Sequence, residues 1–116
     1  DDFSQIVAKT RIENWAGKLS WLETTYAIAR CKALVSGDTG ALHVGDALNR
    51  PTVAILGPTA FGHPARANSI PAEIPLWCRP CTKDGRGRCY NPSFKTCLVD
   101  VTPDRVLKTV EHVLGA

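Results

Sequence analysis

No stretch of about 18 consecutive apolar residues occurs in the sequence, which excludes a transmembrane helix within it. The first residues, Asp1-Asp2-Phe3-Ser4, also lack the basic end and the apolar stretch of a signal peptide. The sequence therefore predicts a cytoplasmic domain, or a part of a protein that rests peripherally on the inner face of the cytoplasmic membrane.

Runs of charge of one sign are absent as well. The 14 lysines and arginines and the 11 acidic residues are scattered, and the formal net charge is +3. Proteins that bind nucleic acid place clustered basic groups against the phosphates, so we expect no nucleic-acid partner. No Gly-x-Gly-x-x-Gly follows a predicted strand, which argues against a dehydrogenase-like dinucleotide site.

The length and composition of the chain are those of one globular domain. The chain has 116 residues, of which 44% are hydrophobic. Residues 1–11 are typical of the end of a helix that begins earlier in a longer protein. Residues 12–15 predict a short strand, and residues 16–18 a turn.

Residues 20–57 predict an alternation of helices and strands. Ser20 and Glu23 have the spacing of a capping box, so a helix should begin there. Short apolar strands are expected at residues 32–36 and 52–56, buried on both sides, with a helix at residues 41–48 between them. The expected buried faces of the two helices are Leu22, Tyr26 and Ala29, and Leu42, Val44 and Leu48. This order predicts an α/β fold with parallel strands.

Residues 60–98 have little periodicity and many prolines, glycines and cysteines. We interpret them as one long ordered excursion in which Trp77 and the cysteines are buried. A last helix should follow, with Thr102 as its cap, Pro103 at its first position and Gly115 at its end. Its expected inner face is Val106, Val110 and Val113.

The turn between the first predicted strand and the next helix is the best candidate for a binding site. Ligands of parallel α/β sheets bind at the carboxyl ends of the strands, and unpaired helix-start amides suit phosphate. Gly37 and Gly40 would let the backbone approach a ligand, and His43 lies one helical turn beyond Thr39. The simpler alternative is that Asp38 or Thr39 only caps the helix.

Five cysteines are present, and four of them, Cys78, Cys81, Cys89 and Cys97, fall in one short segment. Four thiolates can hold zinc tetrahedrally, and Cys-x2-Cys is a usual half-site. The Cys89-x7-Cys97 spacing is wider than in ordinary zinc ribbons, which favours packed thiols or a disulfide formed during handling. The odd fifth residue, Cys31, argues against a fully paired secreted framework.

Several segments together resemble the heptosyltransferase-type glycosyltransferases of lipopolysaccharide synthesis. These segments are 14–20, 31–43, 47–51, 56–59, 78–81 with Cys89 and Cys97, and 102–106. The resemblance implies the carboxyl-terminal domain of a GT-B enzyme, a Rossmann-like parallel sheet flanked by helices. Residues 1–116 would then be the nucleotide-sugar-binding part of a two-domain protein.

The resemblance also implies an activity and a set of contacts. The enzyme would transfer heptose from ADP-heptose to a lipopolysaccharide core acceptor, with inversion and without a required metal. Asp38, Thr39 and Gly40 match the donor-binding turn, His43 the histidine near the donor, and Leu19 a residue that packs on the base. The general base would lie on the amino-terminal domain, so no catalytic residue is expected here. The alternative from another class is a small zinc-stabilised interaction module.

Overall fold

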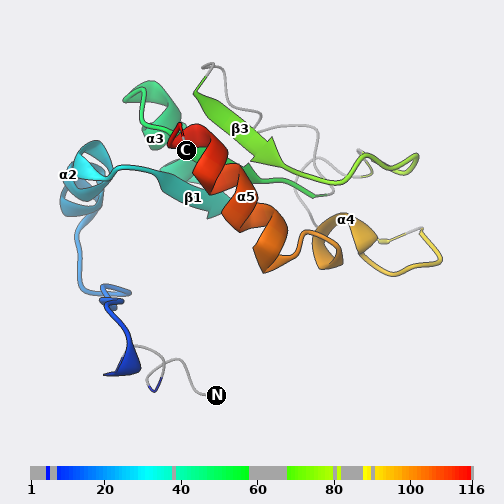
Figure 1. Ribbon diagram of the computed structural model, residues 1–116, viewed down its shortest axis with the longest axis horizontal. Coiled ribbons are helices and arrows are strands. Elements are labelled where there is room, and N and C mark those ends of the chain that lie inside the picture. Colours follow the sequence, from blue (N-terminus) through cyan, green and yellow to red (C-terminus); the bar gives the residue numbers. More distant parts are fainter. Residues whose placement is uncertain are drawn as a thin grey trace.

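The computed structural model describes residue 5 and residues 8–37, 39–57, 68–79, 81, 88–89 and 91–115. Within these described residues, seven elements follow one another (Figure 1). They are α2 (Trp21–Arg30), β1 (Leu34–Gly37), α3 (Gly40–Ala47), β2 (Thr52–Ile55), β3 (Ser69–Ala72), α4 (Thr96–Val99) and α5 (Pro103–Val113). Within the described residues, no helix has the length and apolar character needed to cross a membrane.

The three strands form one parallel sheet in the order β1-β2-β3. The parallel pairing of the first two strands confirms the predicted α/β class. Burial on both sides is confirmed for β2 but is wrong for β1, where Val35 is 43% exposed. The reason is position, since β1 lies at one edge of the described sheet and β2 in its middle.

Helix α3 covers one face of the sheet. Its Leu42 is fully buried and forms the core with Ala54 and Leu56. Gly45 lies so close to the sheet that an added Cβ would meet the side chain of Leu34. The predicted inner residue Leu48 is instead 40% exposed, because the helix ends at Ala47 and the backbone has already turned away.

Helix α5 packs on β2 and β3, in front of the sheet in Figure 1. Thr102 caps it by accepting a hydrogen bond from the Arg105 amide, and Pro103 is its first residue. Gly115 follows its end with φ +76°, as the sequence predicted. The main contacts of α5 are with β2 and β3, and Val35 on β1 remains 43% exposed.

Helix α2 begins where the sequence predicted, with both bonds of the capping box formed. Its expected buried face is wrong, because Leu22 is 78% and Tyr26 64% exposed, whereas Ile28 is buried. The helical spacing was correct, but an apolar stripe does not by itself say which of two apolar faces packs on α3, the element that α2 contacts. The predicted strand at residues 12–15 is also wrong, while the turn at 16–18 is present with Gly17 at φ +71°.

Strand β3 and helix α4 fall inside the segment that the sequence presented as an irregular excursion. Much of that segment, residues 60–67, 80, 82–87 and 90, lies outside the described residues. Pro71 argued against a strand, but β3 is an edge strand of the described sheet, where proline is tolerated. The expected burial of Trp77 is wrong, since its side chain is 75% exposed.

Candidate functional site at the carboxyl edge of the sheet

The three strands end level with one another. Gly37 is paired with Ile55, and Ile55 with Ala72, so their carboxyl ends form one straight edge. Thr39 and Gly40 follow β1 at this edge, Gly57 follows β2 and Glu73 follows β3. Parallel sheets bind ligands outside this edge, so the predicted turn lies where a ligand site belongs.

Thr39 occupies the N-cap position of α3, but in the described part of the chain its side chain bonds no amide of the first turn. Its hydroxyl lies 3.1 Å from that of Ser36 instead. The simpler prediction, that Thr39 only caps the helix, is therefore wrong for its side chain. Asp38, the other candidate cap and the remaining member of the predicted turn, lies outside the described residues.

Gly40 has a neighbour that the sequence did not suggest. A Cβ at Gly40 would stand 3.3 Å from the Cη2 atom of Trp21, the first residue of α2. The indole therefore lies against the start of α3 and gives Gly40 a packing reason in addition to any ligand. At Gly37, by contrast, an added Cβ would meet no atom of the described residues within 4 Å.

His43 lies on α3 one turn after Thr39, and its side chain is exposed. Its amide donates to the Thr39 carbonyl at 3.4 Å, which fixes its place on the first turn. The structure thus brings Thr39, Gly40 and His43 together around one helix start. An exposed imidazole there can donate a hydrogen bond to an anion held by the helix amides.

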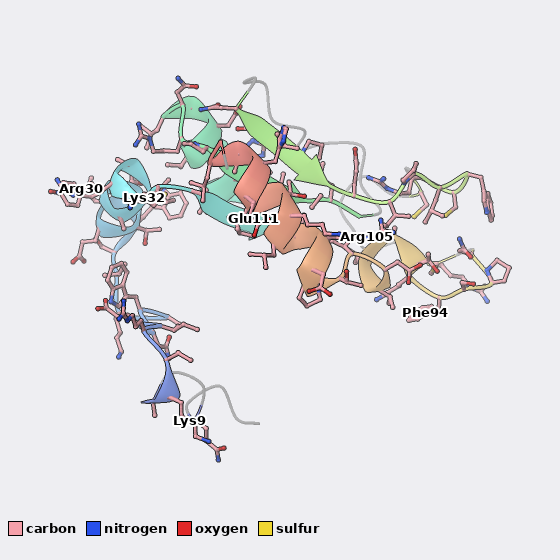
Figure 2. All side chains as sticks on the ribbon, in the orientation of Figure 1. Lys9, Arg30, Lys32, Phe94, Arg105 and Glu111 are labelled. Carbon is pink, nitrogen blue, oxygen red and sulfur yellow. The ribbon has the colours of Figure 1, made fainter. Side chains whose placement is uncertain are left out.

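Leu19 lies apart from these residues, in a groove of about 870 Å³ along α2. The groove is mainly apolar and carries aromatic and charged residues that the sequence did not single out. The guanidinium of Arg30 lies 5.5 Å from the centre of the Tyr26 ring and donates to its hydroxyl at 3.2 Å. Arg30 is labelled on α2 in Figure 2. The lining residues are Trp15, Leu19, Leu22, Glu23, Tyr26, Ala27, Arg30 and Cys31.

Arg79 is a second residue that sequence reasoning missed. Its Nε donates to the carbonyl of Gly57 at 2.6 Å and its NH1 to the carbonyl of Ile74 at 2.7 Å. Its NH2 forms an ion pair with Glu73 at 2.7 Å, and only 12% of its side chain is exposed. This guanidinium ties the segments after β2 and β3 together at the carboxyl edge. The only signal in the sequence was an arginine beside two cysteines.

Three of the four clustered cysteines contact the segment that leads into α4 or lie on α4 itself: Asn91 donates to Cys78, Lys95 donates to Cys89, and Cys97 belongs to α4. Hydrogen bonds from the amide of Lys95 and contact with Asn91 lower the pKa of the Cys89 thiol. Burial raises the pKa of Cys97; the Arg79 charge opposes this rise, while Cys81, Cys78 and Cys89 add to it. No three His, Cys, Asp or Glu side chains of the described chain are already set to hold a metal ion.

A parallel sheet between helices, with a helix start and an arginine clamp at its carboxyl edge, defines a Rossmann-like α/β domain. Comparison with known proteins gives the family. The sequence model of one protein family, glycosyltransferase family 9 (heptosyltransferase), matches residues 3–89. The chain therefore belongs to this family.

Individual relatives agree with this assignment. Lipopolysaccharide heptosyltransferase 2 of Escherichia coli K12 is 34% identical over 103 residues, which cover 87% of this chain and 28% of the relative. Lipooligosaccharide heptosyltransferase 2 of Haemophilus ducreyi is 32% identical over 104 residues, covering 88% and 30%. The solved structure of E. coli ADP-heptose lipopolysaccharide heptosyltransferase II matches with a TM-score of 0.68 and 29% identity, over 96% of this chain and 32% of that one. The chain thus spans about a third of these relatives.

Proposed function

We propose that this chain is the donor-binding part of an inverting glycosyltransferase that moves heptose from ADP-heptose to a lipopolysaccharide core acceptor. The observation that carries the proposal is the start of α3 at the carboxyl edge, in a chain of the heptosyltransferase family. The interaction-module alternative has no comparable support, because the relatives are named as heptosyltransferases.

The donor diphosphate would bind at the first turn of α3. Helix-start amides attract anions through their unpaired N–H groups and the helix dipole. The amides of Leu42 and His43 already donate to the Thr39 carbonyl, so the ligand would bind the earlier amides of the turn, which the Thr39 hydroxyl does not occupy because it lies against Ser36. In the transition state the same amides, with a hydrogen bond from His43, would stabilise the negative charge that develops on the leaving ADP.

The groove along α2 is our candidate for the base. Leu19 and the aromatic rings of Trp15 and Tyr26 line it, and flat apolar walls suit a purine. Trp21 connects the groove to the diphosphate site, because it begins α2 two residues after Leu19 and its indole lies against Gly40.

The rest of the reaction belongs to other parts of the protein. The chain covers 28–32% of its relatives, so we assign the general base and the acceptor contacts to an amino-terminal domain. We assign no catalytic residue here and require no metal for transfer. The protein would work in the cytoplasm, or against the inner face of the cytoplasmic membrane, where a lipid-linked acceptor is exposed.

The function is tested by supplying the whole protein with ADP-heptose and a heptose-accepting lipopolysaccharide core. We expect a heptosylated product of inverted anomeric configuration by NMR, formed equally well in the presence of a chelator. The 116-residue chain alone should form none, because positioning the two substrates needs both domains. Transfer from another nucleotide-sugar in preference to ADP-heptose would refute the donor, and robust transfer by the isolated chain would refute the division of roles.

A further inference from the structure

A small cavity lies between β3 and α5, apart from the start of α3. Its volume is about 230 Å³, and its walls come from the end of β3 and the first two turns of α5. Ala72, the last residue of β3, lines it, so the cavity lies at the carboxyl edge of the sheet. Figure 1 shows the first turns of α5 beside the tip of the β3 arrow. The reaction as assigned so far makes no use of this cavity.

Two cations line the cavity from one face of α5. Arg105 and Lys108 are three positions apart, so their side chains leave the same side of the helix. Both are exposed, and neither has an ion-pair partner among the described residues. The hydroxyl of Thr109, which also lines the cavity, donates to the Arg105 carbonyl at 2.9 Å. The side chains of this wall that can still donate to a ligand are therefore the guanidinium and the ammonium.

The carboxylate in the cavity wall, that of Glu73, is neutralised by a different arginine. NH2 of Arg79 lies 2.7 Å from Oε2 of Glu73, and the other nitrogens of this guanidinium bind the backbone carbonyls described above. The acidic residues of α5, Asp104 and Glu111, do not line the cavity. The two cations of α5 therefore give the cavity a net positive charge, and an anion that enters it meets no carboxylate without a counter-ion.

We propose that Arg105 and Lys108 bind an oxyanion, a phosphate or a carboxylate, that the acceptor saccharide carries. A guanidinium presents paired N–H groups that match two oxygens of such a group, and an ammonium adds a compact charge.

The position of the cavity assigns the anion to the acceptor. Because neighbouring strands are about 4.8 Å apart, the ends of β1 and β3 lie about 10 Å from each other along the carboxyl edge. One diphosphate at the start of α3 does not extend across two strands, and ADP-heptose carries no other charged group. The second anion therefore belongs to the second substrate, and this chain would add one contact to those of the amino-terminal domain. This assignment rests on the proposed function, whereas anion binding in the cavity does not.

Inorganic phosphate is the probe for the cavity itself. With ADP present to occupy the start of α3, phosphate should raise the melting temperature of the whole protein above that in chloride at equal ionic strength. The double variant Arg105→Gln, Lys108→Gln should lose this rise. Lys32→Gln, which removes an exposed cation just before β1, should keep it; Figure 2 labels Lys32 and Arg105 in separate parts of the molecule. No rise in the parent, or an equal rise in the parent and the double variant, overturns the proposal.

Steady-state kinetics of the whole protein test the acceptor. We expect the double variant to raise the KM for the acceptor core about tenfold, with kcat and the KM for ADP-heptose unchanged. Cores stripped of phosphate or with esterified carboxylates identify the anion, because a core that lacks the bound group should have the same KM with the parent and the double variant.

Two kinetic results would overturn the proposal: an equal KM of the parent and the double variant for the intact core, or an equal rise in KM with every core. Loss of phosphate binding by the double variant of a protein that transfers no heptose would support the cavity and refute the proposed function. The two failures are therefore distinguishable.

Discussion

The guanidinium Nε of Arg79 lies 2.6 Å from the carbonyl oxygen of Gly57. Gly57 is buried and pressed from its other side by Leu98, where an added Cβ would collide with that side chain. The backbone just beyond β2 is therefore held between a charged donor and an apolar wall. This point lies on the same carboxyl edge of the sheet as the candidate site at the start of α3.

Replacing Arg79 should damage this edge. Arg79→Ala removes three hydrogen bonds, including the ion pair with Glu73, and we expect a loss of about 2–3 kcal/mol in the free energy of unfolding. Arg79→Lys should recover only part, because an ammonium cannot span all three acceptors in one plane. Urea unfolding measures the effect, with the exposed Arg11→Ala as control. An Arg79→Ala loss no larger than that of Arg11→Ala would contradict the clamp.

Gly40 offers a test that separates packing from ligand access. Gly40→Val should push against the indole of Trp21 and cost about 1 kcal/mol of stability, whereas Gly37→Ala should be tolerated. In the double variant with Trp21→Ala the stability penalty of valine should vanish. ADP binding should stay weak in that double variant if the backbone of Gly40 also approaches the ligand. Tight ADP binding by the double variant would show that packing against Trp21 is the only reason for a glycine at position 40.

The capping box of α2 should make stability depend on pH. Hydrogen bonds from the amide and side chain of Ser20 lower the pKa of Glu23 below its ordinary 4.5. A carboxylate with a lowered folded pKa stabilises the fold above its unfolded pKa, and this contribution is lost as the pH falls through the folded value. Glu23→Gln should therefore be less stable than the parent at pH 7 and equal to it in strong acid. Thermal melts at both pH values measure this. The control Glu13→Gln, which lies outside the capping box, should differ from the parent by the same amount at pH 7 and in strong acid.

The other half of the capping box, Ser20, can be removed without changing a charge. Ser20→Ala leaves the Glu23 amide without its side-chain acceptor at 3.1 Å. We expect a loss of about 1 kcal/mol at neutral pH, typical of an N-cap. Circular dichroism on heating measures it, and an unchanged melting temperature would mean that α2 is held by packing alone.

The sequence predicted those parts of the fold that depend on local patterns. The caps at Ser20 and Thr102, the two strands around α3 and the end at Gly115 are set by neighbouring residues, and the structure confirms them. Parallel pairing followed from the helix between the strands. For the site, the same patterns placed Thr39, Gly40 and His43 on one helix start.

Other features depend on residues far apart in the sequence and could not be predicted from local patterns. The contact between Trp21 and Gly40, and the bond of Arg79 to Gly57, join segments 19 and 22 positions apart. Strand β3 was hidden by Pro71, which is compatible with a strand only once its edge position is known. The wrong face of α2 has a similar cause, because the choice between apolar faces depends on which of them packs on α3.

The most direct test of the donor site is calorimetric titration of the whole protein with ADP-heptose, comparing His43→Ala with His112→Ala. Both histidines are exposed on helices, but only His43 lies at the carboxyl edge. We expect His43→Ala to raise the Kd at least about tenfold, equivalent to about 1.4 kcal/mol, with an unchanged melting temperature. His112→Ala should bind as the parent does. Equal affinity of the parent and a normally folded His43→Ala would show that the donor does not bind at the start of α3.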